Sequence, residues 1–116
     1  MPKDDLIFVG HMLDTARLAA GKVRGVSREV FDADENLRLA LTHLVQTIGE
    51  AGRQVSPPFR KAHPEIPWAK IIAMRHRVVH DYLNVDYDVV WGVLVEDLPK
   101  LIGRLAALVP SEDQQV

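Results

Sequence analysis

A chain of 116 residues with 47% hydrophobic and 26% charged residues suits one compact domain with its own core, and argues against a second. The net charge of −2 argues against a broad basic face for nucleic acid, although a small basic cleft remains compatible with it. The absence of cysteine excludes disulfides, thiolate zinc sites and cysteine nucleophiles, so any chemistry must come from His, carboxylates, Arg, Tyr or hydroxyl groups.

No apolar stretch is long enough to cross a membrane. A spanning helix needs ~20 mostly apolar residues, and none of the runs in this chain approaches that length. Asp4 and Asp5 also precede the first apolar run, which is unlike a secretory signal. We therefore expect a cytoplasmic protein that does not associate with membranes.

The N-terminal half predicts two long helices, because its apolar residues recur at steps of three and four. The first helix should end near Gly25. The second should begin near Asp34, a good N-cap, and end at Ser56-Pro57-Pro58. The positions expected to face inward are Leu6, Val9, Leu13, Ala16, Ala20 and Val23 in the first helix, and Leu37, Leu41, Leu44, Ile48, Ala51 and Val55 in the second.

The C-terminal half predicts two more helices. The proline-rich segment up to Pro67 should be a loop holding at most one short turn of helix. A third helix should run from Pro67 to about His80, and a fourth from Asp86 to about Leu108, kinked at Pro99. The fold class is therefore all-α: a single helical bundle of about four long helices plus short helical turns over residues 1–116, with a polar tail from about residue 110.

Basic residues concentrate around the third helix. The segment from Arg53 to Arg77 contains Glu65 as its one acid, beside a larger set of cations. Such a patch would make a local electropositive surface on a weakly acidic protein. The cations are Arg53, Arg60, Lys61, Lys70, Arg75 and Arg77.

Within the third helix, Arg75 falls in the middle of a broad apolar arc. An unpaired buried guanidinium costs several kcal/mol, so Arg75 must pair with an acid such as Glu50 or Asp14, or face a cleft or subunit junction. His76 and His80 lie on the other side, where they suit either a solvated face or a C-terminal cap. The arc consists of Trp68, Ile71, Ile72, Met74, Val78 and Val79.

The string from Met74 to Tyr82, MRHRVVHDY, resembles the R-x4-H-x-Y signature of the HepT-like branch of the HEPN proteins. Arg75, His80 and Tyr82 match the three signature positions, and His76 stands where the family often has asparagine. Further landmarks follow in family order, so the chain looks like one member from roughly Leu6 to Leu108. They are Ser27-Arg28-Glu29, Ile48-Gly49-Glu50-Ala51, His63-Pro64-Glu65-Ile66-Pro67-Trp68 and Glu96-Asp97-Leu98-Pro99.

The resemblance implies a metal-independent, cofactor-free ribonuclease whose two-fold homodimer brings two motifs to a shared cleft. RNA would be cleaved by attack of its 2′-hydroxyl on the adjacent phosphate. His80 would act as general base or acid and Arg75 would stabilise charge on the phosphate, while His76 and Arg77 would bind or orient the substrate. On a regular helix Arg75 and His80 point about 140° apart, so either a helix end near His80 or the partner's helix must bring them together.

The resemblance gives Tyr82 a different role, as the acceptor of adenylyl groups from an MntA-like nucleotidyltransferase antitoxin. The protein would then be the toxin of a toxin–antitoxin pair, and the modification would block the cleft with charge and bulk. The alternative for Tyr82 is a half-buried phenol that packs where the third helix ends.

Two other functions remain open. His76 and His80 have the i, i+4 spacing of a helical metal site, but the H-E-x-x-H motif would need Glu where Arg77 stands, so we expect no metal. Asp81 or Asp86 would have to complete any other metal site. The second alternative is a non-catalytic nucleotide-binding or adaptor bundle that docks a nucleotidyltransferase partner.

Overall fold

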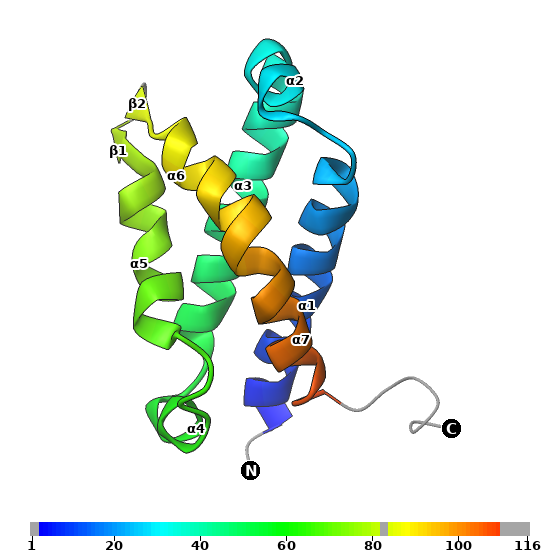
Figure 1. Ribbon diagram of the computed structural model, residues 1–116. Coiled ribbons are helices and arrows are strands. Elements are labelled where there is room, and N and C mark those ends of the chain that lie inside the picture. Colours follow the sequence, from blue (N-terminus) through cyan, green and yellow to red (C-terminus); the bar gives the residue numbers. More distant parts are fainter. Residues whose placement is uncertain (1–2, 82–83, 110–116) are drawn as a thin grey trace.

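The computed structural model describes residues 3–81 and 84–109, with the side chains of residues 4–74 and 85–109. It is an all-α bundle built around one core (Figure 1). The predicted fold class is therefore confirmed. The predicted polar tail from residue 110 lies outside the described residues. Within them, no helix is long and apolar enough to cross a membrane.

The two N-terminal helices form the most extensive contact of the bundle. Helix α1 (Lys3–Val23) packs along α3 (Glu35–Gln54). Asp34 caps α3 as predicted, since its carboxylate accepts a hydrogen bond from the Leu37 N–H at 3.0 Å. Gly25, with φ +73°, lies just beyond the end of α1, a left-handed conformation that glycine adopts without a steric penalty.

Short helices fill the connections on either side of α3. Helix α2 (Arg28–Ala33), which the helical periodicity missed, begins after the N-cap Ser27, and α4 (Pro57–Ala62) begins after the N-cap Ser56. Ser56 also binds the buried carboxylate of Asp5, donating from its N–H and its hydroxyl at 2.7 Å each. Asp5 is 2% exposed, so these bonds hold the start of α1 against α4.

Helix α5 (Trp68–Val78) ends two residues before the predicted end near His80. The chain continues directly into a small antiparallel hairpin of β1 (Val79–Asp81) and β2 (Asn84–Val85), which the prediction of an all-helical segment missed. Adjacent β-branched residues favour extended backbone, and the register pairs Val79 with Val85. This pairing stops the helix at Val78.

The last predicted helix is a single rod in three parts. Helix α6 (Tyr87–Gly92), capped by Asp86, runs into the π-helix η1 (Val93–Asp97), and α7 (Leu98–Ala106) follows. We expected Pro99 to kink this rod; the irregularity is instead the π-helical turn that precedes it. In a regular α-helix, Pro99 would leave the carbonyl four residues earlier without a donor and collide with it. The wider turn accommodates the proline, and the Leu98 N–H bonds to the Val93 carbonyl.

The core lies where α1, α3, α5 and the rod meet, and it contains half of the inward positions named for the first two helices. The other half are only partly buried, whereas Met12 and Ala19 are fully buried and were not expected. The partly buried positions are Leu6, Ala20, Val23, Leu37, Leu44 and Ala51. The largest fully buried side chains are Phe31, Met12, Leu41, Ile48, Ile66, Leu94, Leu98 and Leu105.

Candidate functional site

The backbone places the R-x4-H-x-Y string at one end of the bundle, where α5 gives way to the hairpin (Figure 1). Arg75, His76 and Arg77 belong to the last turns of α5, and His80 belongs to β1. Tyr82 lies outside the described residues, as do the side chains of the other four. Helix α5 ends three residues after Arg75, which is one of the two arrangements expected to bring Arg75 and His80 together.

The end of α5 also removes the geometric basis for the helical metal site. The i, i+4 spacing places two imidazoles on one face only if both residues are helical. His76 is helical and His80 is in β1, so the pair does not share a helical face. Asp86, one of the acids considered for such a site, caps α6 by accepting from the Val89 N–H at 3.2 Å. Among the described residues, no group of three His, Asp or Glu side chains is arranged to hold a metal ion.

An aromatic cluster fixes the C-terminal base of the hairpin to α2. Tyr87, two residues after β2, contacts the Phe31 ring edge-on at 6.1 Å between centroids. The Phe31 ring also lies 5.1 Å from that of Trp91 and is fully buried. The Arg38 guanidinium lies 5.1 Å from the Tyr87 ring centroid and donates hydrogen bonds to the carbonyls of Phe31 and Asp32. Helix α2 therefore contacts the segment that directly follows the hairpin.

An ion pair adds a second connection between α2 and α6. Arg28 donates to Asp32 at 2.9 Å and to Asp88 at 2.7 Å. The hydrogen bonds to Asp32 and Asp88 raise the pKa of Arg28 above its ordinary value, so the guanidinium stays charged. The sequence signals for α2 were Ser27, a good N-cap, and the apolar Phe31 four residues later. Helical periodicity alone did not detect so short a helix.

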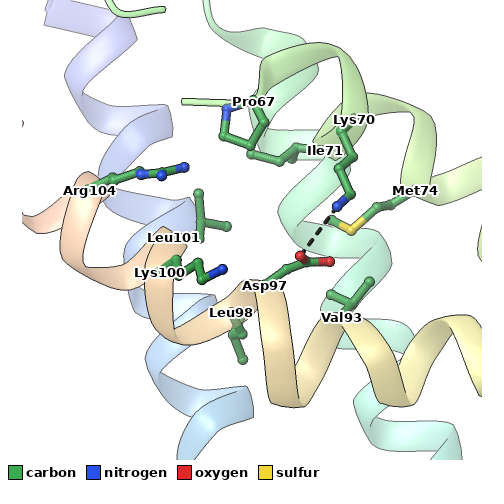
Figure 2. Close-up of a pocket in the computed structure, with 10 residues that line it drawn as sticks. All are labelled: Pro67, Lys70, Ile71, Met74, Val93, Asp97, Leu98, Lys100, Leu101 and Arg104. Carbon is green, nitrogen blue, oxygen red and sulfur yellow. Dashed lines mark hydrogen bonds and ion pairs between the residues drawn. The ribbon is translucent and has the colours of Figure 1, made fainter. Parts of the chain in front are cut away.

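A groove lies between α5 and the C-terminal part of the rod (Figure 2). Its cavity has a volume of about 250 Å³. An ion pair between Lys70 and Asp97, 3.3 Å apart, links its two walls, and the side chains of Lys100 and Arg104 extend from α7 toward the α5 side. The lining residues are Pro67, Lys70, Ile71, Met74, Val93, Asp97, Leu98, Lys100, Leu101 and Arg104.

The basic segment predicted around the third helix is partly neutralised by neighbouring acids. Lys70 pairs with Asp97, and Arg53 lies 3.5 Å from Glu50. The electropositive region of the described surface therefore extends beyond the predicted segment to Lys100 and Arg104, which sequence analysis did not select. Neither has an ion pair with any described acid. Their i, i+4 spacing beside the apolar residues of α7 was the available signal.

Fold and motif together define a helical bundle with an R-x4-H-x-Y string at the end of one helix. A family model described as "Ribonuclease HepT-like" matches residues 12–108, which include the whole string. The chain belongs to this HepT-like family, and the resemblance inferred from its motifs is confirmed.

Named relatives agree with this assignment. "Probable ribonuclease HepT" of Thermococcus cleftensis is 35% identical over 85 residues, covering 73% of this chain and 77% of that protein. "Putative RNase TTE0752" of Caldanaerobacter subterraneus is 29% identical over 105 residues, covering 90% of this chain and 94% of the relative. "Putative RNase MJ1380" of Methanocaldococcus jannaschii is 27% identical, covering 85% and 91%. No solved structure matches the chain significantly.

Proposed function

We propose that this chain is a metal-independent endoribonuclease, acting as the toxin of a HepT/MntA-type pair and folded as a single HepT-like domain over residues 1–116. The observation that carries the proposal is the family match over residues 12–108, which contains the complete R-x4-H-x-Y string. The names of the relatives cited above support ribonuclease activity. The end of α5 at Val78 supports joint action of Arg75 and His80, because it takes His80 out of the helical phase.

The chemistry needs one base, one acid and a cation. His80 removes the proton from the ribose 2′-hydroxyl, whose oxygen attacks the adjacent phosphorus while the bond to the 5′-oxygen breaks. The leaving oxygen takes a proton from a second group, for which His76 or the partner subunit's copy of the motif is available, giving a cyclic phosphate and a 5′-hydroxyl. Arg75 binds the phosphate oxygens through its planar fork as negative charge builds on them, and Arg77 orients the strand.

The decisive experiment is an RNA cleavage assay in excess EDTA, comparing wild type with Arg75→Ala and His80→Ala. Loss of proton transfer should slow His80→Ala by roughly 10²–10⁴-fold. His43→Ala is the matched control, because His43 is an exposed histidine of α3. This variant should cleave RNA at the wild-type rate. Equal cleavage by all variants, or none by wild type, would contradict the assignment and favour the adaptor function.

We further propose regulation through Tyr82, adenylylated by an MntA-like nucleotidyltransferase antitoxin that uses ATP. The added phosphate and adenosine would occlude the motif and repel the RNA backbone. The chain has two tyrosines, so Tyr87→Phe is a natural control for Tyr82→Phe. Incubation with antitoxin and ATP should add one adenylyl group to wild type and Tyr87→Phe. Labelling of Tyr82→Phe to the same extent would overturn this assignment.

The proposed active form is a homodimer that places two motifs at one cleft. Isologous pairing repeats each motif across the two-fold axis, so one protomer can supply groups that the other lacks. Light scattering at micromolar concentration should therefore give twice the chain mass. A monomer that cleaves RNA at the full rate would rule out the shared cleft.

A further inference from the structure

The groove between α5 and α7 combines an apolar floor with an excess of positive charge. Three cations line it, Lys70, Lys100 and Arg104, against the single carboxylate of Asp97. The groove therefore carries two more positive than negative charges, on a chain whose net charge is −2. Its floor consists of Ile71, Met74, Val93, Leu98 and Leu101, all of which are buried. This combination suits an anion that also presents an apolar face.

The path of the helices explains why this space is open and where it leads. Helix α5 contacts α6 near the hairpin, and the rod then diverges from α5 toward the end of the bundle that carries α4 (Figure 1). The groove occupies the resulting wedge. At its narrow end it is lined by Met74, the residue immediately before Arg75. The groove therefore reaches the helical turn that carries the motif arginine.

The π-helical turn shapes one wall of this space. Val93 and Asp97, the first and last residues of η1, both line the groove (Figure 2). π-Helical turns are rare and are frequent at functional sites. Here the turn brings Asp97 to Lys70, 3.3 Å away. That pair neutralises the middle of the groove and leaves the charge of Lys100 and Arg104 unopposed at its wide end.

We propose that this groove binds single-stranded RNA flanking the scissile phosphate, an inference that rests on the proposed ribonuclease function. Lys100 and Arg104 are exposed, lie one helical turn apart and have no acid partner among the described residues, so both can contact phosphates. The bases lie on the apolar floor. None of the described lining residues is aromatic, so base stacking contributes little and base preference in the groove is weak.

An acidic peptide is the other occupant that the charge would admit, and two observations favour RNA. The groove is lined by Met74, in the helical turn that carries Arg75, so a substrate that extends from the motif along α5 reaches it. Its free cations stand in a row on one wall, a pattern that matches the repeating charge of a nucleic acid backbone. RNA is therefore the proposed occupant of the groove, and binding of a protein partner is the competing outcome of the test.

The test compares substrates that reach the groove with substrates that do not. Cleavage of the dinucleotide UpA and of the octanucleotide U8 is measured for wild type and for the double variant Lys100→Glu/Arg104→Glu. The KM for U8 should rise about ten-fold or more in the variant, with kcat unchanged, and kcat/KM for UpA should stay within about two-fold of wild type. The salt slope of U8 binding should fall by about 1.4, or 0.7 for each lost phosphate contact.

A matched control separates local contacts from net charge. Arg17→Glu/Lys22→Glu makes the same charge change on exposed residues of α1 that do not line the groove, and it should bind U8 as wild type does. The neutral variant Lys100→Gln/Arg104→Gln should show a smaller loss in the same direction, without introducing repulsion. U8 binding is also followed by fluorescence anisotropy in a His80→Ala background, which gives a readout independent of cleavage.

Each outcome decides between the two proposals. Equal weakening by the α1 control, or unchanged U8 affinity in the groove variant, would overturn the RNA groove while leaving cleavage at the motif intact. Unchanged U8 affinity with lost antitoxin binding would assign the groove to a protein. U8 binding that depends on Lys100 and Arg104 in a protein that never cleaves RNA would support the groove and overturn the nuclease.

Discussion

The two helix pairs of this bundle are built differently. Helices α1 and α3 are long, uninterrupted and closely packed along their lengths. On the other side, α5 packs on α3 and ends early in a hairpin, and the rod beside it is broken by a π-helical turn. Every departure from regular helix in the second pair adjoins the motif or the groove. The first pair therefore acts as a scaffold, and the irregular second pair carries the candidate functional surfaces.

This division has a physical basis. A regular helix satisfies its own backbone and presents one stripe to the core, which leaves little room for concave sites. Ending α5 at Val78 frees the residues after it from the helical phase, and the π-turn lies at the groove, which both of its end residues, Val93 and Asp97, line. Concave space appears where helical regularity stops. The comparison predicts that changes in the two pairs will separate into losses of stability and losses of function.

The largest effect should come from Phe31→Ala, because Phe31 anchors the short helix α2 to α6. Its fully buried ring contacts Tyr87 and Trp91 of α6, so truncation removes apolar contact and leaves a cavity. The free energy of unfolding should fall by about 3–5 kcal/mol, measured by urea denaturation. RNA cleavage should also fall at temperatures where the variant is still folded, because the base of the hairpin is loosened.

Val30→Ala is the control for that variant, since Val30 is the adjacent apolar residue and is 51% exposed. It should change stability by less than about 0.5 kcal/mol. A loss in Phe31→Ala no larger than in Val30→Ala would show that the contact between α2 and α6 contributes little to stability.

A smaller loss is expected at Asp5, which holds the scaffold pair at its far end. Asp5→Ala leaves the partly buried N–H and hydroxyl of Ser56 without their partner, which should cost about 1–3 kcal/mol. Asp4→Ala is the neighbouring exposed acid and should be close to neutral. Because Asp5 is remote from the motif, kcat should be unchanged. A reduced kcat in fully folded Asp5→Ala would contradict the assignment of α1 and α3 to a scaffold that is separate from the functional surfaces.

The two helix caps offer the same chemical change in each pair. Asp34 caps α3 and Asp86 caps α6, each by a carboxylate that accepts one N–H. Each substitution by alanine should cost about 1 kcal/mol of unfolding free energy, within a range of roughly 0.5–2. Only Asp86→Ala should raise KM or lower kcat, because Asp86 directly follows β2. Equal changes of KM and kcat in the two variants would show that the Asp86 cap has no specific effect on the hairpin.

Sequence patterns predicted the scaffold more completely than the functional pair, for a physical reason. Apolar periodicity and capping residues are local signals, and they placed both long helices and the cap at Asp34. The π-turn depends on tertiary packing, because it must accommodate Pro99 while the leucines of α7 still face the core. The hairpin depends on pairing between Val79 and Val85. The motif string itself was visible because its resemblance rests on identity and spacing. The groove could not be predicted, because its lining residues, such as Lys70 and Arg104, come from two helices whose relative placement the sequence does not give.

The smallest effect is expected for Pro99→Ala, which tests whether the proline or the core maintains the π-turn. Replacing the proline would permit a regular α-helix, but that change would rotate everything after it by about 100° about the helix axis. Leu98, Leu101 and Leu105 would then leave the core, at a cost of about 1.5–3 kcal/mol for each side chain. The gain of one hydrogen bond, about 1 kcal/mol, is too small to offset that loss.

The π-turn should therefore persist in Pro99→Ala, with stability within about 1 kcal/mol of wild type, since the regained donor and the more flexible unfolded chain have opposite effects. Amide hydrogen exchange along residues 93–105 should keep its wild-type pattern, and U8 affinity should change by less than two-fold. An exchange pattern typical of an uninterrupted α-helix, together with weaker U8 binding, would mean that Pro99 itself holds the groove wall in place. The π-turn would then be caused by the proline and not by packing in the core.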